Sequence, residues 1–372
     1  MRIFLTLNSS ASSGFKDFTW KKIFYDTLQK MGHDVVFFSY EEATYKNKVK
    51  LSSLAAISEN IYDNFIKHHK EKDFDIFFSY YHSLNVNPEL FKRLKGKVLC
   101  VNYTTNFHQI NDYKDILKEV DLSIYASIEA KSYFEENNIE SYYMPFAALK
   151  STSKNVGLKN GNLSFVGTSY GNRPYYIYRL LQNNLPMKIY GFNWKKNTKT
   201  NSLLRSIKLQ KEILSNSKNV LDTAYKNLNN LILDEINLKY KKFINDPLND
   251  YGYNQLLSNS SIILNIPESR YNHNYTNPKV LIGANLRDFE VPALGSLLLT
   301  QYNEEISSLF DLEKEIVTFK NEWEMVDKAK FFLKKPNLSL KIADAGQKRV
   351  NNEHLWVHRF ETLFSYLKKN FL

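Results

Sequence analysis

Two side chains that could hold a phosphorylated, ribose-bearing ligand lie three residues apart, at Arg287 and Glu290. The planar guanidinium of an arginine can pair with phosphate oxygens, and a glutamate can accept hydrogen bonds from vicinal hydroxyls. Helical spacing puts Leu286 and Phe289 on one side and the Arg–Glu pair elsewhere on the helix surface. An exposed i,i+3 ion pair is the simpler interpretation, and the two residues alone favour it.

A second candidate site follows the apolar segment 163–167. That segment ends in Gly167, and a loop of small residues then leads to Arg173 in the first turn of an expected helix. A glycine lets the backbone approach a phosphate closely, and a helix N-terminus attracts anions. Because the helix dipole disfavours a cation at that end, Arg173 is better explained if it meets an anion. An ordinary strand-to-helix turn with a surface arginine is the alternative.

The elements that must position these residues alternate between short apolar strands and helices. The expected strands are 2–7, 34–38, 75–78, 97–101 and 122–125 in the first part of the chain, and the pattern resumes at 163–167. This alternation predicts doubly wound α/β domains with parallel sheets. With 372 residues the chain exceeds the usual size of one core, so two domains are expected.

The domain boundary is expected at 149–162, which is polar and has no apolar period. We therefore predict an N-terminal domain over 1–150, a C-terminal domain over 151–352 and a final helix over 353–372. Residues 195–244 interrupt the α/β rhythm, and they carry eleven Lys or Arg against four Asp or Glu. They predict a basic helical insertion at about 195–250, which could contact an anionic membrane or a second copy of the chain, or only cover its domain.

Ligands of an open parallel sheet bind at the carboxyl ends of its strands. In the first domain this places Ser13 and Gly14 after the first strand, and His82, Asn106 and His108 after later ones. Histidine titrates near neutrality, so His108 is a candidate catalytic residue and the other four are candidate ligand contacts. A flexible loop, and a solvated or helix-capping histidine, are the ordinary alternatives.

Composition excludes several other classes. The single cysteine, Cys100, lies in an apolar run and predicts a buried thiol and no disulfide framework. The sequence has no CxxC, HExxH or Walker motif, and Asp73-Phe74-Asp75 precedes a strand where a metal site would follow one. We find no signal peptide and no apolar run of membrane-spanning length. The net charge of +11 favours anionic partners, but no nucleic-acid motif accompanies it.

The motifs together resemble CgeB-type glycosyltransferases, which are GT-B enzymes related to retaining family-4 transferases. Three strings carry the resemblance: Arg-x-Phe-Glu then Pro-Ala-Leu-Gly over 287–295, Phe-Val-Gly then Arg over 165–173, and Ala-x-x-Gly-x-x-Arg-Val over 343–350. In that group a glutamate five residues before the glycine contacts the donor ribose, and Glu290 stands five before Gly295. Many family-4 enzymes have another glutamate eight positions earlier, where this chain has Ile282.

The resemblance implies two Rossmann-like domains facing across a cleft, with an acceptor domain over 1–150, a nucleotide-sugar domain over 151–352 and a last helix that returns to the first domain. The acceptor contacts would then be Ser13, Gly14, His82 and Asn106. It also implies further donor contacts: Tyr190 and Gly191 near the base, with Arg270 and Lys279 from a loop beside the diphosphate. Tyr190 could equally be a core residue, and that loop an ordinary surface loop. The same kinship makes Glu290 a candidate catalytic residue.

The expected activity is transfer of a sugar from a nucleotide sugar to a cell-surface glycan, a lipid-linked acceptor or a protein, retaining and without metal or cofactor. The expected location is the cytoplasm, with the inner face of the membrane as a further option. Because of Ile282, an inactive GT-B scaffold or binding protein is one alternative. A nucleotide-sugar epimerase on the same fold is the other.

Overall fold

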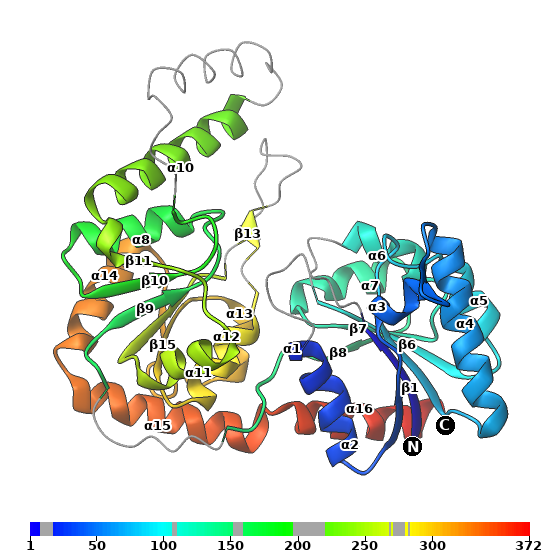
Figure 1. Cartoon of the computed structure of the whole chain (residues 1–372). Helices are drawn as coiled ribbons and strands as arrows, with labels where there is room; N and C mark the ends of the chain where they lie inside the picture. The colour runs from blue at the N-terminus through cyan, green and yellow to red at the C-terminus, as the bar shows by residue number, and fades with distance from the viewer. Residues whose placement is uncertain are drawn as a thin grey trace. The chain divides into compact units, whose positions relative to one another are not determined.

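The computed structural model describes residues 1–7, 18–105, 110–151, 159–195, 220–267, 269–270, 280–281 and 283–372. The chain forms two compact units. The first comprises Met1–Leu149 and His354–Leu372, and the second comprises Lys150–Glu353. A six-stranded parallel sheet lies at the centre of each unit (Figure 1), which confirms the predicted fold class of two doubly wound α/β domains.

The first sheet has the order β2-β1-β5-β6-β7-β8, and every neighbouring pair is parallel. Its central strands are buried at almost every position because helices cover both faces, and such strands read as continuous apolar runs, whereas the edge strands β2 and β8 are partly exposed. They are β1 (Arg2–Leu7), β2 (Asp34–Phe37), β5 (Ile76–Tyr80), β6 (Leu99–Thr104), β7 (Leu122–Tyr125) and β8 (Ser141–Tyr143).

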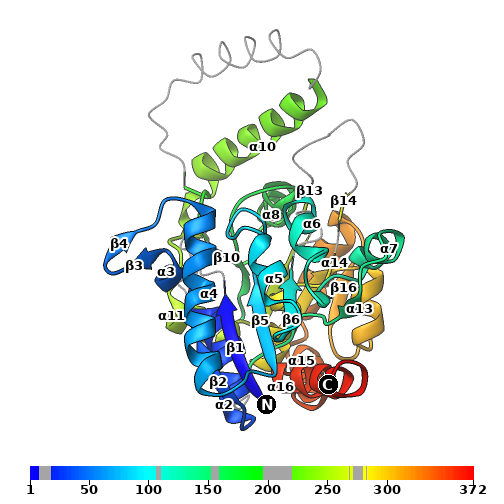
Figure 2. The same ribbon diagram turned by 90° about the vertical axis from the view of Figure 1, so that its right-hand side faces the viewer.

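The helices of the first unit divide between the two faces of its sheet (Figure 1, Figure 2). Helices α3, α4 and α5 share one core with Phe4 and Phe77 of the strands. The sequence analysis did not predict α4, an 18-residue helix capped by Ser53. The helical segments are α1 (Phe18–Lys21), η2 (Lys22–Asp26), α2 (Thr27–Lys30), α3 (Tyr40–Ala43), α4 (Leu54–Glu71), α5 (Glu89–Leu94), α6 (Ile110–Leu117), η4 (Ile128–Ala130) and α7 (Lys131–Glu136), and β3 (Tyr45–Lys46) pairs with β4 (Val49–Lys50).

The last helix, α16 (Trp356–Asn370), belongs to the first unit although it ends the chain. Phe360 is fully buried and packs edge-on against Phe24 of η2, with a ring-centroid distance of 5.5 Å. Arg359 donates to the carbonyl oxygens of Pro145 and Phe146 at 3.1 and 3.2 Å. These contacts give α16 a structural role in a unit whose other residues precede position 150.

The second sheet has the order β11-β10-β9-β12-β15-β16 and is also parallel throughout. Its strands are β9 (Leu163–Val166), β10 (Met187–Tyr190), β11 (Ile244–Asn245), β12 (Ile262–Asn265), β15 (Leu297–Gln301) and β16 (Val317–Phe319). A separate two-stranded ribbon joins β13 (Ser269–Arg270) to β14 (Val280–Leu281).

One face of the second sheet packs against α8, α10 and α14 in a single apolar core. On the other face Leu257 of α11 and Phe289 of α12 are fully buried. The helices are α8 (Arg173–Gln182), α10 (Val220–Lys239), η5 (Lys241–Phe243), α11 (Asp250–Asn259), α12 (Leu286–Ala293), α13 (Glu304–Leu309), α14 (Glu322–Leu333) and α15 (Pro336–Glu353).

The helical insertion predicted at about 195–250 extends too far, because β11 within it is the edge strand of the second sheet. Helix α10 is the longest described helix of this segment. Its inner side buries Ile232, Leu233 and Ile236 in the core of the second unit, whereas Leu231 and Leu238 are exposed. In the part of the chain that the structure describes, no helix is long and apolar enough to span a membrane.

Candidate functional site

The carboxyl edge of the second sheet contains a topological switch point between β9 and β12. From β9 the chain continues outward on one side through β10 and β11, and it then returns to the other side of β9 with β12. The loops that follow two such strands leave in opposite directions and open a crevice where open α/β sheets bind ligands. The candidate donor-binding residues that the structure describes follow strands of this sheet.

The loop after β9 lies very close to the loop after β10. Gly167 donates its N–H to the carbonyl of Tyr190 at 2.9 Å, and its own carbonyl accepts from the indole of Trp194 at 2.7 Å. A Cβ on Gly191 would lie only 2.2 Å from that same carbonyl oxygen, so only glycine fits this position. Trp194 is fully buried, which makes it a core residue, whereas Tyr190 is half-buried at the edge.

Arg173 bridges the two strands of the switch point from the first turn of α8. Its Nε donates to the carbonyl of Ile266, just after β12, and its Nη1 donates to the carbonyl of Thr168, just after β9. The guanidinium lies 3.9 Å from the centroid of the Tyr170 ring, and the residue is only 4% exposed. Arg173 therefore fixes the two loops relative to each other, which the sequence did not suggest.

Burial lowers the pKa of Arg173 to about 10, and the positive charge of Arg287 acts in the same direction. The two arginines from α8 and α12 thus lie near each other at the carboxyl edge. Holding two cations together is unfavourable unless an anion joins them, so the arrangement favours a negatively charged ligand.

We expect Arg173→Lys to destabilise the second unit by about 2 kcal/mol, because lysine keeps the charge but cannot reach both carbonyls with a planar fork. Chemical denaturation followed by circular dichroism measures this loss. The matched control is Arg179→Lys, since Arg179 lies on the same helix and donates to Gln182 in an exposed position. Equal stability of the two variants would contradict the bridging role of Arg173.

The N-terminus of α12 is held by a buried network that the sequence analysis missed. Asp288 has no exposed surface, and its Oδ1 accepts from Asn265 and from Thr300, each at 2.7 Å. Its Oδ2 accepts the backbone N–H of Asn285, which caps the helix in turn. Burial raises the pKa of Asp288 despite these hydrogen bonds. The network ties the start of α12 to β12 and β15 and so fixes where Arg287 and Glu290 lie.

Glu290 has a partner other than the one that helical spacing suggested. The hydroxyl of Tyr253, in the first turn of α11, donates to its Oε2 at 2.6 Å. Glu290 is half-buried, and burial raises its pKa while the Tyr253 hydrogen bond and the Arg287 charge lower it. The simpler interpretation, an exposed i,i+3 ion pair, does not describe the pair, because both residues are half-buried and the Glu290 carboxylate accepts from Tyr253 of α11.

Arg287 lies next to all of these groups. Its charge acts on Arg173, Tyr253, Asp288 and Glu290. Its Nε is buried, and no described residue accepts a hydrogen bond from it. The structure thus brings together Gly167, Arg173, Arg287 and Glu290 at one edge of one sheet, with Arg287 between Arg173 and Glu290.

Several predicted site residues fall outside the described part of the chain. These are Ser13, Gly14, Asn106, His108 and Lys279, together with Ile282 at the position of the missing glutamate. The backbone of Arg270 is described as the end of β13. The assignments of these residues remain predictions.

His82 follows β5 at the carboxyl edge of the first sheet, where that sheet has its own switch point between β1 and β5. Its Nδ1 accepts the backbone N–H of Leu84 at 3.3 Å, so in the neutral ring the proton is on Nε2. Burial lowers the pKa of His82, although Asp112 opposes this shift. With Nδ1 occupied in this way, the neutral ring has no acceptor nitrogen left, which does not suit removing a proton from a hydroxyl group.

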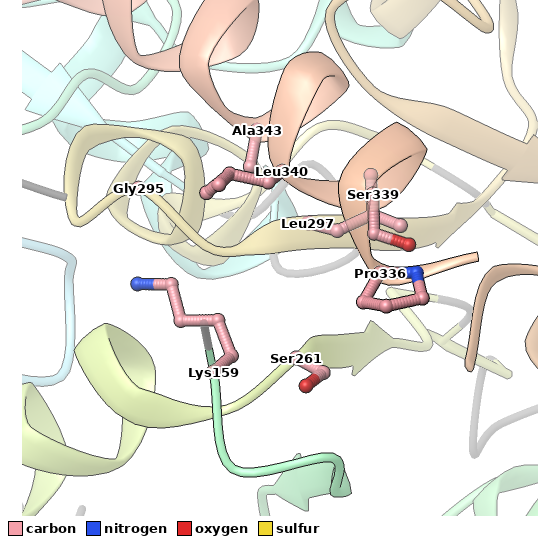
Figure 3. A pocket seen from close by; sticks show the side chains of 8 residues that line it. All are labelled: Lys159, Ser261, Gly295, Leu297, Pro336, Ser339, Leu340 and Ala343. Atoms are coloured by element: carbon pink, nitrogen blue, oxygen red, sulfur yellow. The ribbon is translucent and has the colours of Figure 1, made fainter. Parts of the chain in front are cut away.

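A small cavity of about 20 Å³ lies elsewhere in the second unit (Figure 3). Its lining includes Lys159, Ser261 and Leu297 at the amino ends of β9, β12 and β15, with residues of α15. This is the edge opposite to the switch-point loops, and the space is no larger than a water molecule needs. We do not assign the cavity to the candidate site.

Metal chemistry has no candidate centre in the described ranges, where no three His, Cys, Asp or Glu side chains converge on a common point. Cys100 is buried, and burial raises the pKa of its thiol, so this group is an unsuitable nucleophile.

Solved structures identify the class: the fold is that of GT-B glycosyltransferases. Sucrose-phosphate synthase from Thermosynechococcus elongatus matches 99% of this chain and 100% of its own, with a TM-score of 0.63 at 10% identity. A glycosyltransferase from Rickettsia africae matches 99% and 98%, with a TM-score of 0.61 at 11% identity. The HepE protein of Anabaena, solved in complex with UDP and glucose, matches 98% and 99%, with a TM-score of 0.61 at 9% identity.

The family follows from the sequence. The family model described as "Glycosyl transferase-like" matches residues 177–365, more than half of the 372-residue chain. The protein therefore belongs to this glycosyl transferase-like family, and the match includes Tyr253, Arg287 and Glu290. No curated protein matches the sequence. The narrower resemblance to CgeB-type enzymes remains a prediction.

Proposed function

We propose that the protein is a retaining, metal-independent glycosyltransferase that moves a sugar from a nucleotide sugar to a glycan, a lipid-linked acceptor or a protein. Family membership supports glycosyl transfer in general. The observation that carries the proposed donor site is the grouping of Arg173, Arg287 and Glu290 beside the β9–β12 switch point.

In this proposal Arg287 contacts the diphosphate with its guanidinium, whose Nε has no acceptor among the described residues. Arg173 donates to Thr168 in the loop after β9 and contributes positive charge there. The backbone at Gly167 in the same loop lets a phosphate approach closely. Glu290 accepts from the ribose hydroxyls, and Tyr190 lies next to the base. Phe192 is 48% exposed on the same loop and offers an additional aromatic surface.

The chemical step breaks the bond between the anomeric carbon and the diphosphate oxygen, and the electron pair leaves with the diphosphate. An acceptor hydroxyl forms the new bond to the anomeric carbon, and its proton passes to the departing diphosphate oxygen. Arginine side chains can neutralise the charge that develops on the leaving diphosphate, which is how a transferase without metal would lower the barrier. We propose His82 as a hydrogen-bond donor to the acceptor. The catalytic assignment of His108 stays a prediction.

A donor panel tests this proposal. UDP-, GDP- and CMP-sugars are screened by thermal shift, with UDP-glucose first because the HepE structures contain UDP or UDP-glucose. We expect one donor class to raise the melting temperature, since binding to the folded state stabilises it, and the same donor to lose its sugar to water or to an added acceptor. The Arg287→Ala variant should lose the shift, whereas Arg179→Ala, on a different part of the same unit, should keep it.

The alternatives predict different outcomes of the same panel. Binding without turnover in the presence of glycan, lipid and protein acceptors would show that the protein is an inactive binding protein. Conversion of one nucleotide sugar into another with no acceptor present would show that it is an epimerase. Absence of any shift would overturn the nucleotide-sugar site itself.

A further inference from the structure

Tyr253 is an unassigned residue of the candidate site whose hydroxyl has a specific position. Its neighbour Tyr251, two residues away on α11, is 74% exposed, whereas Tyr253 turns inward between α11 and α12. The hydroxyl of Tyr253 donates to Glu290 Oε2 at 2.6 Å, which is the short distance typical of a bond to a carboxylate. A tyrosine that only filled space between the helices would need its ring but not this hydrogen bond.

The hydrogen bond fixes one oxygen of the carboxylate and leaves the other for a ligand. Oε2 is occupied by Tyr253, and no described residue donates to Oε1. A glutamate side chain has three rotatable bonds, so an unrestrained carboxylate would lose rotamer entropy on meeting a diol. Tyr253 fixes that geometry before the ligand arrives.

The same hydrogen bond also affects Arg287. Residues 287 and 290 are separated by three positions on α12, a spacing at which an arginine and a glutamate readily form an ion pair. The Tyr253 hydroxyl lies between the two, because it donates to Glu290 and is also hydrogen-bonded to the Arg287 side chain. The tyrosine thus links the carboxylate to the guanidinium, whose Nε has no acceptor among the described residues.

We propose that Tyr253 is a positioning residue that orients Glu290 toward the ribose hydroxyls of the nucleotide and so makes the site selective for ribonucleotides over 2′-deoxyribonucleotides. This inference rests on the proposed nucleotide-sugar function. Tyr253 acts through Glu290 and does not itself contact the ligand.

The test compares matched pairs of nucleotides on the full-length protein by isothermal titration calorimetry: UDP with 2′-deoxy-UDP, GDP with 2′-deoxy-GDP, and CMP with 2′-deoxy-CMP. For the pair that binds, we expect the wild type to favour the ribonucleotide by about 10-fold, the loss that one hydrogen bond to a charged group predicts. Tyr253→Phe should lower ribonucleotide affinity by about 10-fold and deoxyribonucleotide affinity by less than 3-fold, so that the preference disappears.

Tyr251→Phe is the matched control, because it removes a hydroxyl from the exposed tyrosine of the same helix, and it should keep the full preference. A second variant, Glu290→Asp, leaves Tyr253 intact but shortens the carboxylate by one methylene and should lose the preference as Tyr253→Phe does. A purely structural role for Tyr253 predicts weaker binding of both nucleotides in equal proportion.

The outcomes separate this inference from the proposed function. If the wild type binds no nucleotide of the three pairs, the proposed function fails and the inference fails with it. If the wild type binds a ribonucleotide selectively and Tyr253→Phe keeps that selectivity, the role of Tyr253 is refuted while the nucleotide site stands.

Discussion

Glu290→Gln is expected to lower the affinity for the donor by about 30- to 100-fold without destabilising the unliganded protein. The amide keeps the size of the side chain and can still accept from the Tyr253 hydroxyl. It loses the negative charge that strengthens hydrogen bonds from ribose hydroxyls, and a bond to a charged group contributes about 1.5–3 kcal/mol. Calorimetric titration of wild type and variant with the donor measures the difference.

Glu290 also gives the wild-type protein a pH-dependent stability that the Glu290→Gln variant should lack. Burial raises the pKa of Glu290 above its ordinary value of 4.5, so the folded state binds this proton more tightly than the unfolded state. The free energy of unfolding therefore falls as pH rises from about 4.5 through the raised folded pKa. Glutamine removes this contribution. Relative to the variant, the wild type should lose stability over that pH range, as measured by denaturation at a series of pH values.

Weaker donor binding by Glu290→Gln together with unchanged or higher stability would show that Glu290 serves the ligand and not the fold. If the variant instead loses stability at neutral pH and binds the donor normally, Glu290 is a structural residue and the ribose assignment is wrong. Glu322→Gln serves as a control, since Glu322 accepts a hydrogen bond from Tyr175 at 2.8 Å on another face of the second unit.

The central strands of both sheets could be predicted from the sequence because they are buried on two faces, whereas the two-residue edge strand β11 was missed. A parallel strand covered by helices must be apolar at consecutive positions, as 76–78 and 297–299 are, and that signal needs no knowledge of the partner strands. Helix α4 was missed although its apolar residues Ile57, Ile61 and Phe65 repeat at helical spacing. The expected strand pattern passed directly from residue 38 to residue 75 and left that segment unassigned.

The candidate site could be predicted only in part, because its side chains depend on partners distant in sequence. The string 287–290 makes Arg287 a candidate phosphate contact, but the hydroxyl that donates to Glu290 comes from position 253. The carbonyl that Arg173 binds at Ile266 is 93 residues away. A buried Asp288 bonded to Asn265 and Thr300 has a local signal only in the capping box with Asn285.

Gly191 shows how such long-range contacts decide which residue type can occupy a position. It has a φ of 140°, which side-chain-bearing residues rarely adopt, and a Cβ would lie 2.2 Å from the Gly167 carbonyl oxygen. That oxygen is already fixed by the Trp194 indole, and it belongs to backbone rather than to a side chain that could turn away. A methyl group here must displace the loop after β9, and with it Thr168, to which Arg173 donates.

Gly191→Ala is therefore expected to lower the free energy of unfolding by about 4 kcal/mol and to abolish donor binding. The matched control is Gly161→Ala, since Gly161 also has a positive φ, of 73°, but a Cβ there meets nothing within 4 Å. That variant should lose only about 1 kcal/mol, the cost of the backbone conformation, and should bind normally. Denaturation and donor titration of both variants distinguish the two effects. If Gly191→Ala loses no more stability than Gly161→Ala, the close approach of the two loops does not exist in solution, and the geometry that joins Gly167 to Arg173 fails with it.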